Sequence, residues 1–290
     1  CRKRLKLFSR ILIYLKKDKP TPYHPAMNER QHSRKTNLFI ILGSIFLTNA
    51  ILAEIIGVKI FSAEKTLGFQ PVNWNIFGEY ILDFNLTAGA VIWPIVFITT
   101  DIINEYFGKK GVRKISFITA GLIAYIFLII TIVTKLVPAD FWLEVNAQTP
   151  DGASFNIDYA FNTIFRQGLG IILGSLTAFL LGQLIDVFVF QKLRAVTGPK
   201  MIWLRATGST LVSQFIDSFV VLGIAFYVFG NWELSQIFAV GLINYVYKFG
   251  VAILLTPLLY LGHRVIDRYL GKELADKMAH EAAEDKSFLG

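Results

Sequence analysis

The chain contains little cysteine and histidine, and few charged residues for its length. Its one cysteine is Cys1, so no disulfide framework can form within it, and there is no Cys-x-x-Cys or Cys/His cluster for zinc. The histidines His24, His32, His263 and His280 lie in the polar ends, which excludes an HExxH protease within the apolar part. A Walker motif and a GxGD motif are also missing. We therefore expect no enzymatic activity, no metal site and no cofactor.

Charge is scarce where apolar residues are abundant. Only 17% of the 290 residues are charged, against about a quarter in soluble domains, while 54% are hydrophobic and the mean hydropathy is +0.51. Six apolar segments are long enough to cross a hydrocarbon core of ~30 Å. They are Leu38–Ile60, Gly89–Tyr106, Ile115–Val137, Gly168–Phe190, Ala206–Phe229 and Ile237–Gly262. Short connections, such as residues 108–114, predict antiparallel neighbours. The expected fold is all-α, a polytopic membrane bundle of six transmembrane helices formed by residues 37–263.

Basic residues gather in the connections and tails on one side of these segments. They account for 24 of the 29 Lys and Arg: residues 1–36, 107–114, 191–205 and 264–290. By the positive-inside rule, both termini are predicted to be cytoplasmic. The net charge of +8 therefore indicates orientation at a lipid membrane, and no nucleic-acid partner.

The two ends are expected to lie outside the bundle. Residues 1–36 form a basic arm and residues 264–290 a charged tail. Within the arm, Lys3–Lys17 alternates basic and apolar residues. This pattern suits either an amphipathic helix on anionic headgroups or a solvated basic tail.

Three consecutive spans each carry an ionisable residue with an amide one helical turn away. The pairs are Gln183 with Asp186, Gln214 with Asp217, and Asn244 with Lys248. Spacings of three and four residues place both members of a pair on one helix face. A charged group near the centre of a membrane helix costs at least ~2.5 kcal/mol, so three such groups predict a polar cavity between the helices.

The first two spans add Asn49 and Asp101 to this polar set. Lys248 lies too deep to reach either interface, and Asp101, Asp186 or Asp217 could neutralise it. Asp217 could line a functional cavity or belong to a structural ion pair. The embedded carboxylates outnumber the embedded lysines, which suits a cationic or donor-rich substrate, or protons.

Small residues recur at every fourth position of the fourth span. Gly170, Gly174, Ala178 and Gly182 form a stripe that allows another backbone to approach closely. The stripe predicts either packing within the bundle or a homodimer seam.

Several segments together resemble the queuosine precursor transporter family, also described as vitamin-uptake-like, of bacterial inner membranes. The resemblance covers residues 38–262. The matching motifs are TNAILAEIIGVKI (Thr48–Ile60), TTDIINEYFGKKGVRK (Thr99–Lys114), GQLIDVFVFQKLR (Gly182–Arg194), GSTLVSQFIDSF (Gly208–Phe219) and NYVYKFGVAILLTPLLY (Asn244–Tyr260). It implies a helix count and fold similar to the substrate-binding components of energy-coupling-factor vitamin transporters. It also implies uptake of 7-deazaguanine-type bases used to make queuosine in tRNA. The basic arm and residues 61–87 are not core features of the family.

We therefore predict an inner-membrane transporter of queuosine precursors. The predicted substrate-binding residues are Asn49, Asp101, Gln183, Asp186, Gln214, Asp217, Asn244 and Lys248. Carboxylates can accept the N–H groups of a guanine-like edge, and amides or Lys can donate to its carbonyl. Two alternatives stay open: a substrate-capture subunit that needs a separate ATPase module, and a general purine carrier.

Overall fold

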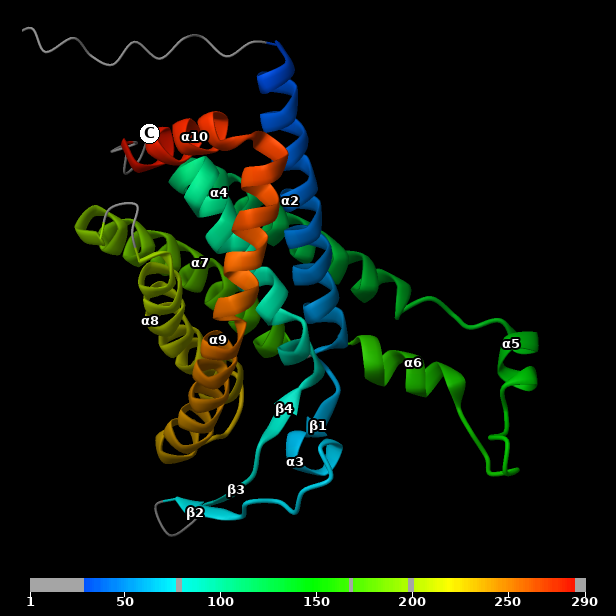
Figure 1. Cartoon of the computed structure of the whole chain (residues 1–290). Helices are drawn as coiled ribbons and strands as arrows, with labels where there is room; N and C mark the ends of the chain where they lie inside the picture. Colours follow the sequence, from blue (N-terminus) through cyan, green and yellow to red (C-terminus); the bar gives the residue numbers. More distant parts are fainter. Residues whose placement is uncertain (1–28, 77–79, 167–168, 198–200, 285–290) are drawn as a thin grey trace, which may run out of the picture.

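Long helices make up most of the chain (Figure 1). The computed structural model describes residues 29–76, 80–166, 169–197 and 201–284. The predicted amphipathic segment Lys3–Lys17 lies outside these residues. The long helices are α2 (Glu29–Ile56), α4 (Trp93–Val133), α7 (Leu169–Thr197), α8 (Ile202–Leu222) and α9 (Leu234–Leu270). The shorter ones are α3 (Ala63–Thr66), α5 (Asp140–Val145), α6 (Ile157–Phe165) and α10 (Lys272–Glu284), with a 3₁₀ turn η1 (Ala88–Val91) and a π-helical stretch η2 (Gly223–Val228).

Within the described residues, five helical stretches are long and apolar enough to cross a membrane. They are Glu29–Ile56, Trp93–Val133, Ile202–Val228, Leu234–Leu270, and Ile157–Thr197, which comprises α6 and α7 on either side of residues outside the description. The predicted count of six differs because the second and third predicted spans are the two arms of α4. The predicted connection between them, residues 108–114, continues as helix after a break at Gly108 alone.

Gly108 breaks α4 because its backbone leaves the helical region, with φ 65° and ψ −168°. Glycine adopts such a positive φ without steric cost. A Cβ at this position would also lie 3.1 Å from the carbonyl oxygen of Ala282 in α10. The chain therefore changes direction within one residue, next to the C-terminal helix.

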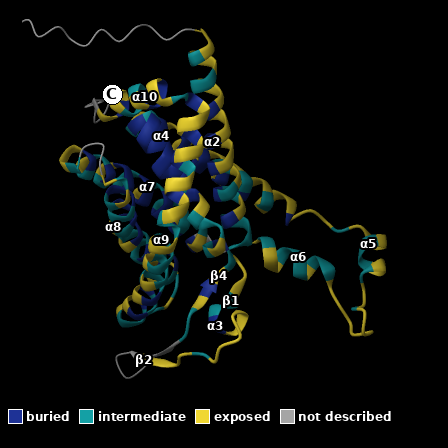
Figure 2. Ribbon diagram, viewed as in Figure 1, coloured by how far each residue is buried: buried dark blue, intermediate teal, exposed yellow. Residues whose placement is uncertain are grey.

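The core follows a stripe along α2 and the faces of α4 that meet it. Leu38, Leu42, Phe46 and Ala50 recur every fourth residue of α2 and are all buried, as expected for one face of a helix. Figure 2 shows the buried residues toward the centre of the bundle and exposed ones on its outer faces. Large apolar side chains such as Leu128 on α4 are exposed on those faces, where lipid would cover them.

The stripe of small residues on α7 packs against α8 and η2 of the same chain. A Cβ at Gly170 would lie 2.4 Å from the Cβ of Phe229, and one at Gly174 would lie 3.0 Å from the carbonyl oxygen of Val221. Ala178 is only 1% exposed. Of the two alternatives for the stripe, packing within the bundle is the one present, and a second copy would have to displace η2.

The connection between α2 and α4 forms two small antiparallel sheets, which the all-α prediction did not contain. Strand β1 (Ile60–Ser62) pairs with β4 (Asn85–Thr87), and β2 (Trp74–Ile76) pairs with β3 (Tyr80–Leu82). Glu64 of α3 links the two ends of this connection. Its carboxylate accepts the backbone N–H of Phe84, just before β4, at 2.7 Å, and the hydroxyl of Ser62, at the end of β1, at 3.0 Å. Burial raises the pKa of Glu64, but these hydrogen bonds outweigh it and leave the pKa below its usual range.

The C-terminal part is more ordered than the predicted charged tail. Helix α9 continues eight residues beyond the predicted end of the last span, to Leu270. Helix α10 then returns across the bundle, and its Leu274, Ala275 and Met278 are at most 3% exposed. The charged residues of this segment alternate with apolar ones at helical spacing, so α10 can dock one face and keep its charges in water.

Candidate functional site

A small polar cavity lies between α4, α7, α8 and α9. Its lining consists of Trp93, Phe97, Phe179, Gly182, Gln183, Asp186, Ser213, Gln214, Asp217 and Lys248. The volume is about 30 Å³, which is room for a water molecule. Typical ligand pockets begin near ~300 Å³. This conformation is therefore closed around the polar groups.

Five of the eight residues predicted for the substrate site line this cavity: Gln183, Asp186, Gln214, Asp217 and Lys248. Both pairs spaced by three residues, on α7 and on α8, face it. The reason is local, because a spacing of three brings two side chains to the same face of a helix.

Lys248 of α9 is paired with Asp217 of α8. Its Nζ lies 2.5 Å from Oδ2 of Asp217, and both side chains are about one-fifth exposed. Of the three carboxylates that could neutralise Lys248 according to the sequence, Asp217 is therefore the one that does so. Across from the pair, a Cβ at Gly182 would lie 3.7 Å from the Cβ of Asp217, so the glycine leaves space beside the carboxylate.

The other polar groups of the cavity are tied to neighbouring helices. The Thr100 hydroxyl of α4 donates to Oε1 of Gln183 at 3.3 Å, and the Ser213 hydroxyl of α8 donates to Oδ1 of Asp186 at 3.2 Å. Oε1 of Gln214 is buried and has no hydrogen-bond partner among the described residues. A buried acceptor without a donor is costly, so Gln214 offers an unused contact inside the cavity.

Asp101 lies in an adjoining cavity that shares Phe97 with the first. This second cavity, also about 30 Å³, is lined by Asp101, by Thr207, Thr210 and Thr256, and by apolar residues of α4, α8 and α9. Asp101 is 6% exposed, and its Oδ1 has no hydrogen-bond partner in the described part of the chain. It nevertheless lies close enough to Asp186 for their charges to interact.

Two predicted site residues do not line either cavity. The amide of Asn49 donates to the carbonyl of Ile45 in its own helix at 2.8 Å. Asn244 is half-buried on α9, one turn before Lys248. Glu54 of α2, outside the predicted set, accepts a hydrogen bond from Ser175 of α7 and is in electrostatic range of Asp217.

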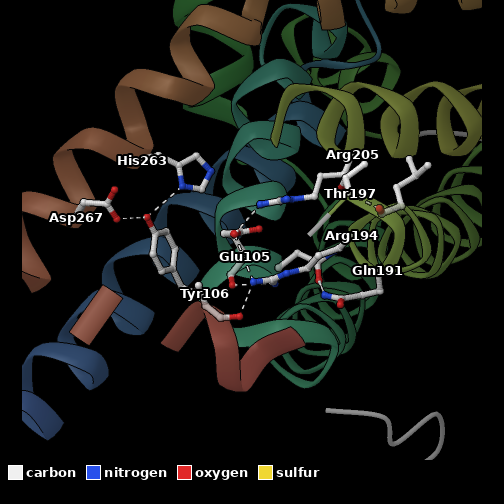
Figure 3. A network of polar contacts seen from close by, with 11 residues as sticks. Glu105, Tyr106, Gln191, Arg194, Thr197, Arg205, His263 and Asp267 are labelled. Atoms are coloured by element: carbon white, nitrogen blue, oxygen red, sulfur yellow. Dashed lines mark hydrogen bonds and ion pairs between the residues drawn. The ribbon is translucent and has the colours of Figure 1, made fainter. Parts of the chain in front are cut away.

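A second polar cluster, which the sequence analysis missed, surrounds Glu105 (Figure 3). Arg205 approaches Glu105 at 2.7 Å and Arg194 does so at 3.4 Å, and all three residues are at most 7% exposed. Arg194 also donates to the backbone carbonyls of Glu105 and Ala279. The cluster therefore ties α4, α7 and α8 to α10.

The same cluster continues to α9 through Tyr106. Its hydroxyl donates to Oδ1 of Asp267 at 2.6 Å and lies 3.1 Å from Nδ1 of His263. Next to the cluster, Gln191 of α7 donates to Asn104 of α4 at 2.7 Å. These contacts hold α4, α7 and α9 together next to α10, whose Ala279 carbonyl accepts from Arg194 (Figure 3).

The sequence analysis missed this cluster because it placed Arg194 and Arg205 in a basic connection and His263 in a polar end, outside the apolar spans. A signal was nonetheless present. Glu105 lies one turn after Asp101, and Arg205 immediately precedes the apolar start of a predicted span. A carboxylate and a guanidinium at the same membrane depth on neighbouring helices favour an ion pair.

Within the described residues, no three His, Cys, Asp or Glu side chains gather where they could bind a metal ion. The chemistry available in the two cavities is therefore hydrogen bonding, charge pairing and proton exchange.

Comparison with known proteins places these features in a family. The sequence model of the putative vitamin uptake transporter family matches residues 87–262. A probable queuosine precursor transporter of Bacillus subtilis is 30% identical over 204 residues, which cover 69% of this chain and 82% of that protein. The queuosine precursor transporter of Escherichia coli is 30% identical over 206 residues, or 68% of this chain and 80% of that protein.

A further relative, a probable queuosine precursor transporter of Haemophilus influenzae, is 27% identical over 59% of this chain and 66% of that protein. No solved structure matches the chain, so the likeness to energy-coupling-factor components stays a prediction. The matched region contains α4, α7, α8 and most of α9, and all the residues that line the two cavities lie within it. The chain is therefore a multi-pass membrane protein of the putative vitamin uptake transporter family, the family of the queuosine precursor transporters.

Proposed function

We propose that this chain imports queuosine precursors, bases of the 7-deazaguanine type, across the bacterial inner membrane. The observation that carries the proposal is the cavity in which Asp217 and Lys248 meet at 2.5 Å beside Gln183, Asp186 and Gln214. The names of the relatives supply the substrate class.

The lining of the cavity suits a guanine-like base. Asp186 or Asp217 can accept two N–H groups of its edge, and the Gln214 amide or Lys248 can donate to its carbonyl. Trp93 contacts Phe97 and Phe179 with ring centroids 5.7 and 6.0 Å apart, and such rings offer stacking faces to a planar base. An aminomethyl substituent would be cationic and would suit the carboxylates.

Loading requires the helices to separate, because the closed cavity admits little more than a water molecule. The Asp217–Lys248 pair bridges α8 and α9, so its opening and re-formation accompany that separation. Opposite ends of the bundle would open in turn, with the cluster around Glu105 closing one of them.

We further propose that both termini are cytoplasmic. The basic connections predicted to share a side lie at one end of the bundle, where α10, the start of α2 and the break in α4 are found (Figure 1). The sheets β1–β4 and β2–β3 and the turn between η2 and α9 lie toward the other end. No homodimer through Gly170, Gly174, Ala178 and Gly182 is part of the proposal, because α8 and η2 cover this stripe.

Uptake by purified full-length chain in liposomes tests the proposal. We expect the radiolabelled cyano or aminomethyl deazaguanine to accumulate, without chemical change, and Asp217→Ala or Asp186→Ala to reduce uptake at least tenfold. Asp140→Asn, an acidic residue of α5 away from both cavities, is the matched control and should transport normally.

Other outcomes identify the alternatives. Binding without uptake until an ATPase module is added would make the chain a substrate-capture subunit. Equal uptake of guanine would make it a general purine carrier, and a chemically altered base would make it an enzyme. Normal uptake by both Ala variants would remove the site assignment.

A further inference from the structure

The buried acids and bases of the two polar regions are unequal in number. Glu105 is matched by Arg205 at 2.7 Å and Arg194 at 3.4 Å, and Asp217 by Lys248 at 2.5 Å. Asp101 and Asp186 have no ion pair among the described residues. Glu105, Asp101 and Asp186 together make three carboxylates for the two guanidinium groups of Arg194 and Arg205, which leaves one negative charge in excess.

Asp101 of α4 and Asp186 of α7 line adjoining cavities that share Phe97. Their charges interact, and the two residues are 6% and 5% exposed. Two ionised carboxylates whose charges interact in an apolar interior carry a large cost, so one of the two takes up a proton. The excess charge and the interaction between the two acids thus both indicate one bound proton.

The surroundings of the two acids differ. Asp186 accepts the Ser213 hydroxyl at 3.2 Å, which stabilises its ionised form. Oδ1 of Asp101 is buried in the second cavity and meets no donor in the described residues. A proton on this oxygen removes the excess charge without needing further ligands. Asp101 is therefore the acid that carries it.

Other titratable groups near the pair are already engaged. The charge of Arg205 in α8 interacts with that of Asp101, but Arg205 is bound to Glu105. Among the described residues, α9 contributes only Ala252, Leu255, Thr256 and Leu259 to the Asp101 cavity. On α9, Lys248 is paired with Asp217, and His263 contacts Tyr106. On α7, Arg194 pairs with Glu105, and on α2, Glu54 accepts a hydrogen bond from Ser175.

We propose that Asp101 and Asp186 form the ion-coupling site of this transporter, which binds one proton on Asp101 and moves it inward with each substrate. The proposal rests on the function proposed above. Asp186 lines the substrate cavity and Asp101 the adjoining one. A base whose N–H groups bind the Asp186 carboxylate partly neutralises its charge. Binding of the base therefore changes how tightly Asp101 retains its proton. In the cycle, the O–H bond on Asp101 forms with a proton from outside and breaks when that proton passes to water inside.

The test uses full-length chain in liposomes with the membrane potential clamped at zero. With the outside more acidic by about one pH unit, a one-proton symport of a neutral base supports at most about tenfold accumulation. We expect wild type to approach this value with the cyano compound, to acidify the interior, and to lose accumulation when a protonophore is added. Asp101→Asn should bind and exchange the base but accumulate none. The matched control Thr119→Val, at another buried position of α4 whose hydroxyl has no described partner, should behave as wild type.

A second measurement does not depend on transport. Infrared difference spectra of purified wild type and Asp101→Asn at neutral pH should differ by the carbonyl band of a protonated carboxylic acid. Absence of this band in wild type overturns the proton site, whether or not Asp101→Asn folds well.

The outcomes separate the two proposals. Transport that ignores the pH gradient, or that follows a sodium gradient instead, overturns proton coupling and leaves the proposed function intact. A protonated Asp101 in a chain that transports no deazaguanine under any gradient overturns the function and the coupling, and leaves the proton site standing.

Discussion

Lys248 and Asp217 form an ion pair whose partners come from different helices within the apolar bundle. Removing one partner of a buried pair costs about 3–5 kcal/mol in soluble proteins, because the other charge is left uncompensated. Lys248→Met should therefore lower the melting temperature in detergent and abolish uptake. The double variant Lys248→Met with Asp217→Asn should recover stability but not uptake. Recovered uptake would reduce the pair to a structural role.

An exposed ion pair provides the matched control for this measurement. Lys35 and Glu281 lie 3.5 Å apart with side chains 30% and 44% exposed. Exposed pairs contribute about 0–1 kcal/mol. Lys35→Met should therefore leave the melting temperature nearly unchanged. If Lys35→Met lowered the melting temperature as much as Lys248→Met, burial of an ion pair would not determine how much it contributes to stability.

Glu64, outside the membrane-spanning helices, predicts a pH dependence. Hydrogen bonds from Phe84 and Ser62 keep its pKa below the unfolded value of about 4.3. The lower folded pKa stabilises the fold at pH above that value, and the contribution is lost as the pH falls through the folded pKa. Glu64→Gln should therefore be less stable than wild type at pH 7, and the difference should shrink below about pH 4. The test is the melting temperature of both proteins measured across this pH range. A stability difference that grows in acid would contradict a lowered pKa of Glu64.

At the scale of elements, the contact of α7 with η2 depends on small residues. Any side chain at Gly174 meets the carbonyl oxygen of Val221 and Ala225, so Gly174→Leu must force the two elements apart. Overpacking of this kind costs about 1–3 kcal/mol. Gly121→Leu on α4 is the control, since no atom of the described residues lies within 4 Å of its added Cβ. We expect a clear fall in melting temperature for Gly174→Leu alone; equal stability of the two variants would show that α7 and η2 do not pack closely.

At the scale of the whole molecule, the proposed orientation places α10 inside the cell and α5 outside. In a Cys1→Ser background, Asp151→Cys should react with a membrane-impermeant maleimide in intact cells, because residue 151 lies in the exposed segment between α5 and α6. Ala283→Cys, exposed near the end of α10, should react only after the membrane is permeabilised. The reverse pattern would place both termini outside.

The sequence by itself determined the membrane class, most of the helices and the helix faces that carry Gln183, Asp186, Gln214 and Asp217. Hydropathy and helical periodicity are local properties, and they do not depend on which helices become neighbours. The motifs around these residues also sufficed for the family.

Only the tertiary structure decided which charges meet. Whether Lys248 pairs with Asp101, Asp186 or Asp217 depends on the order and rotation of the helices. The spacing of residues along the sequence does not determine either of these. The same holds for Glu105, whose partners Arg194 and Arg205 lie about 90 and 100 residues away along the chain. The break at Gly108 and the docking of α10 likewise follow from contacts between distant segments. Burial of a polar group is set by its neighbours in space, and these are fixed only when the helices pack.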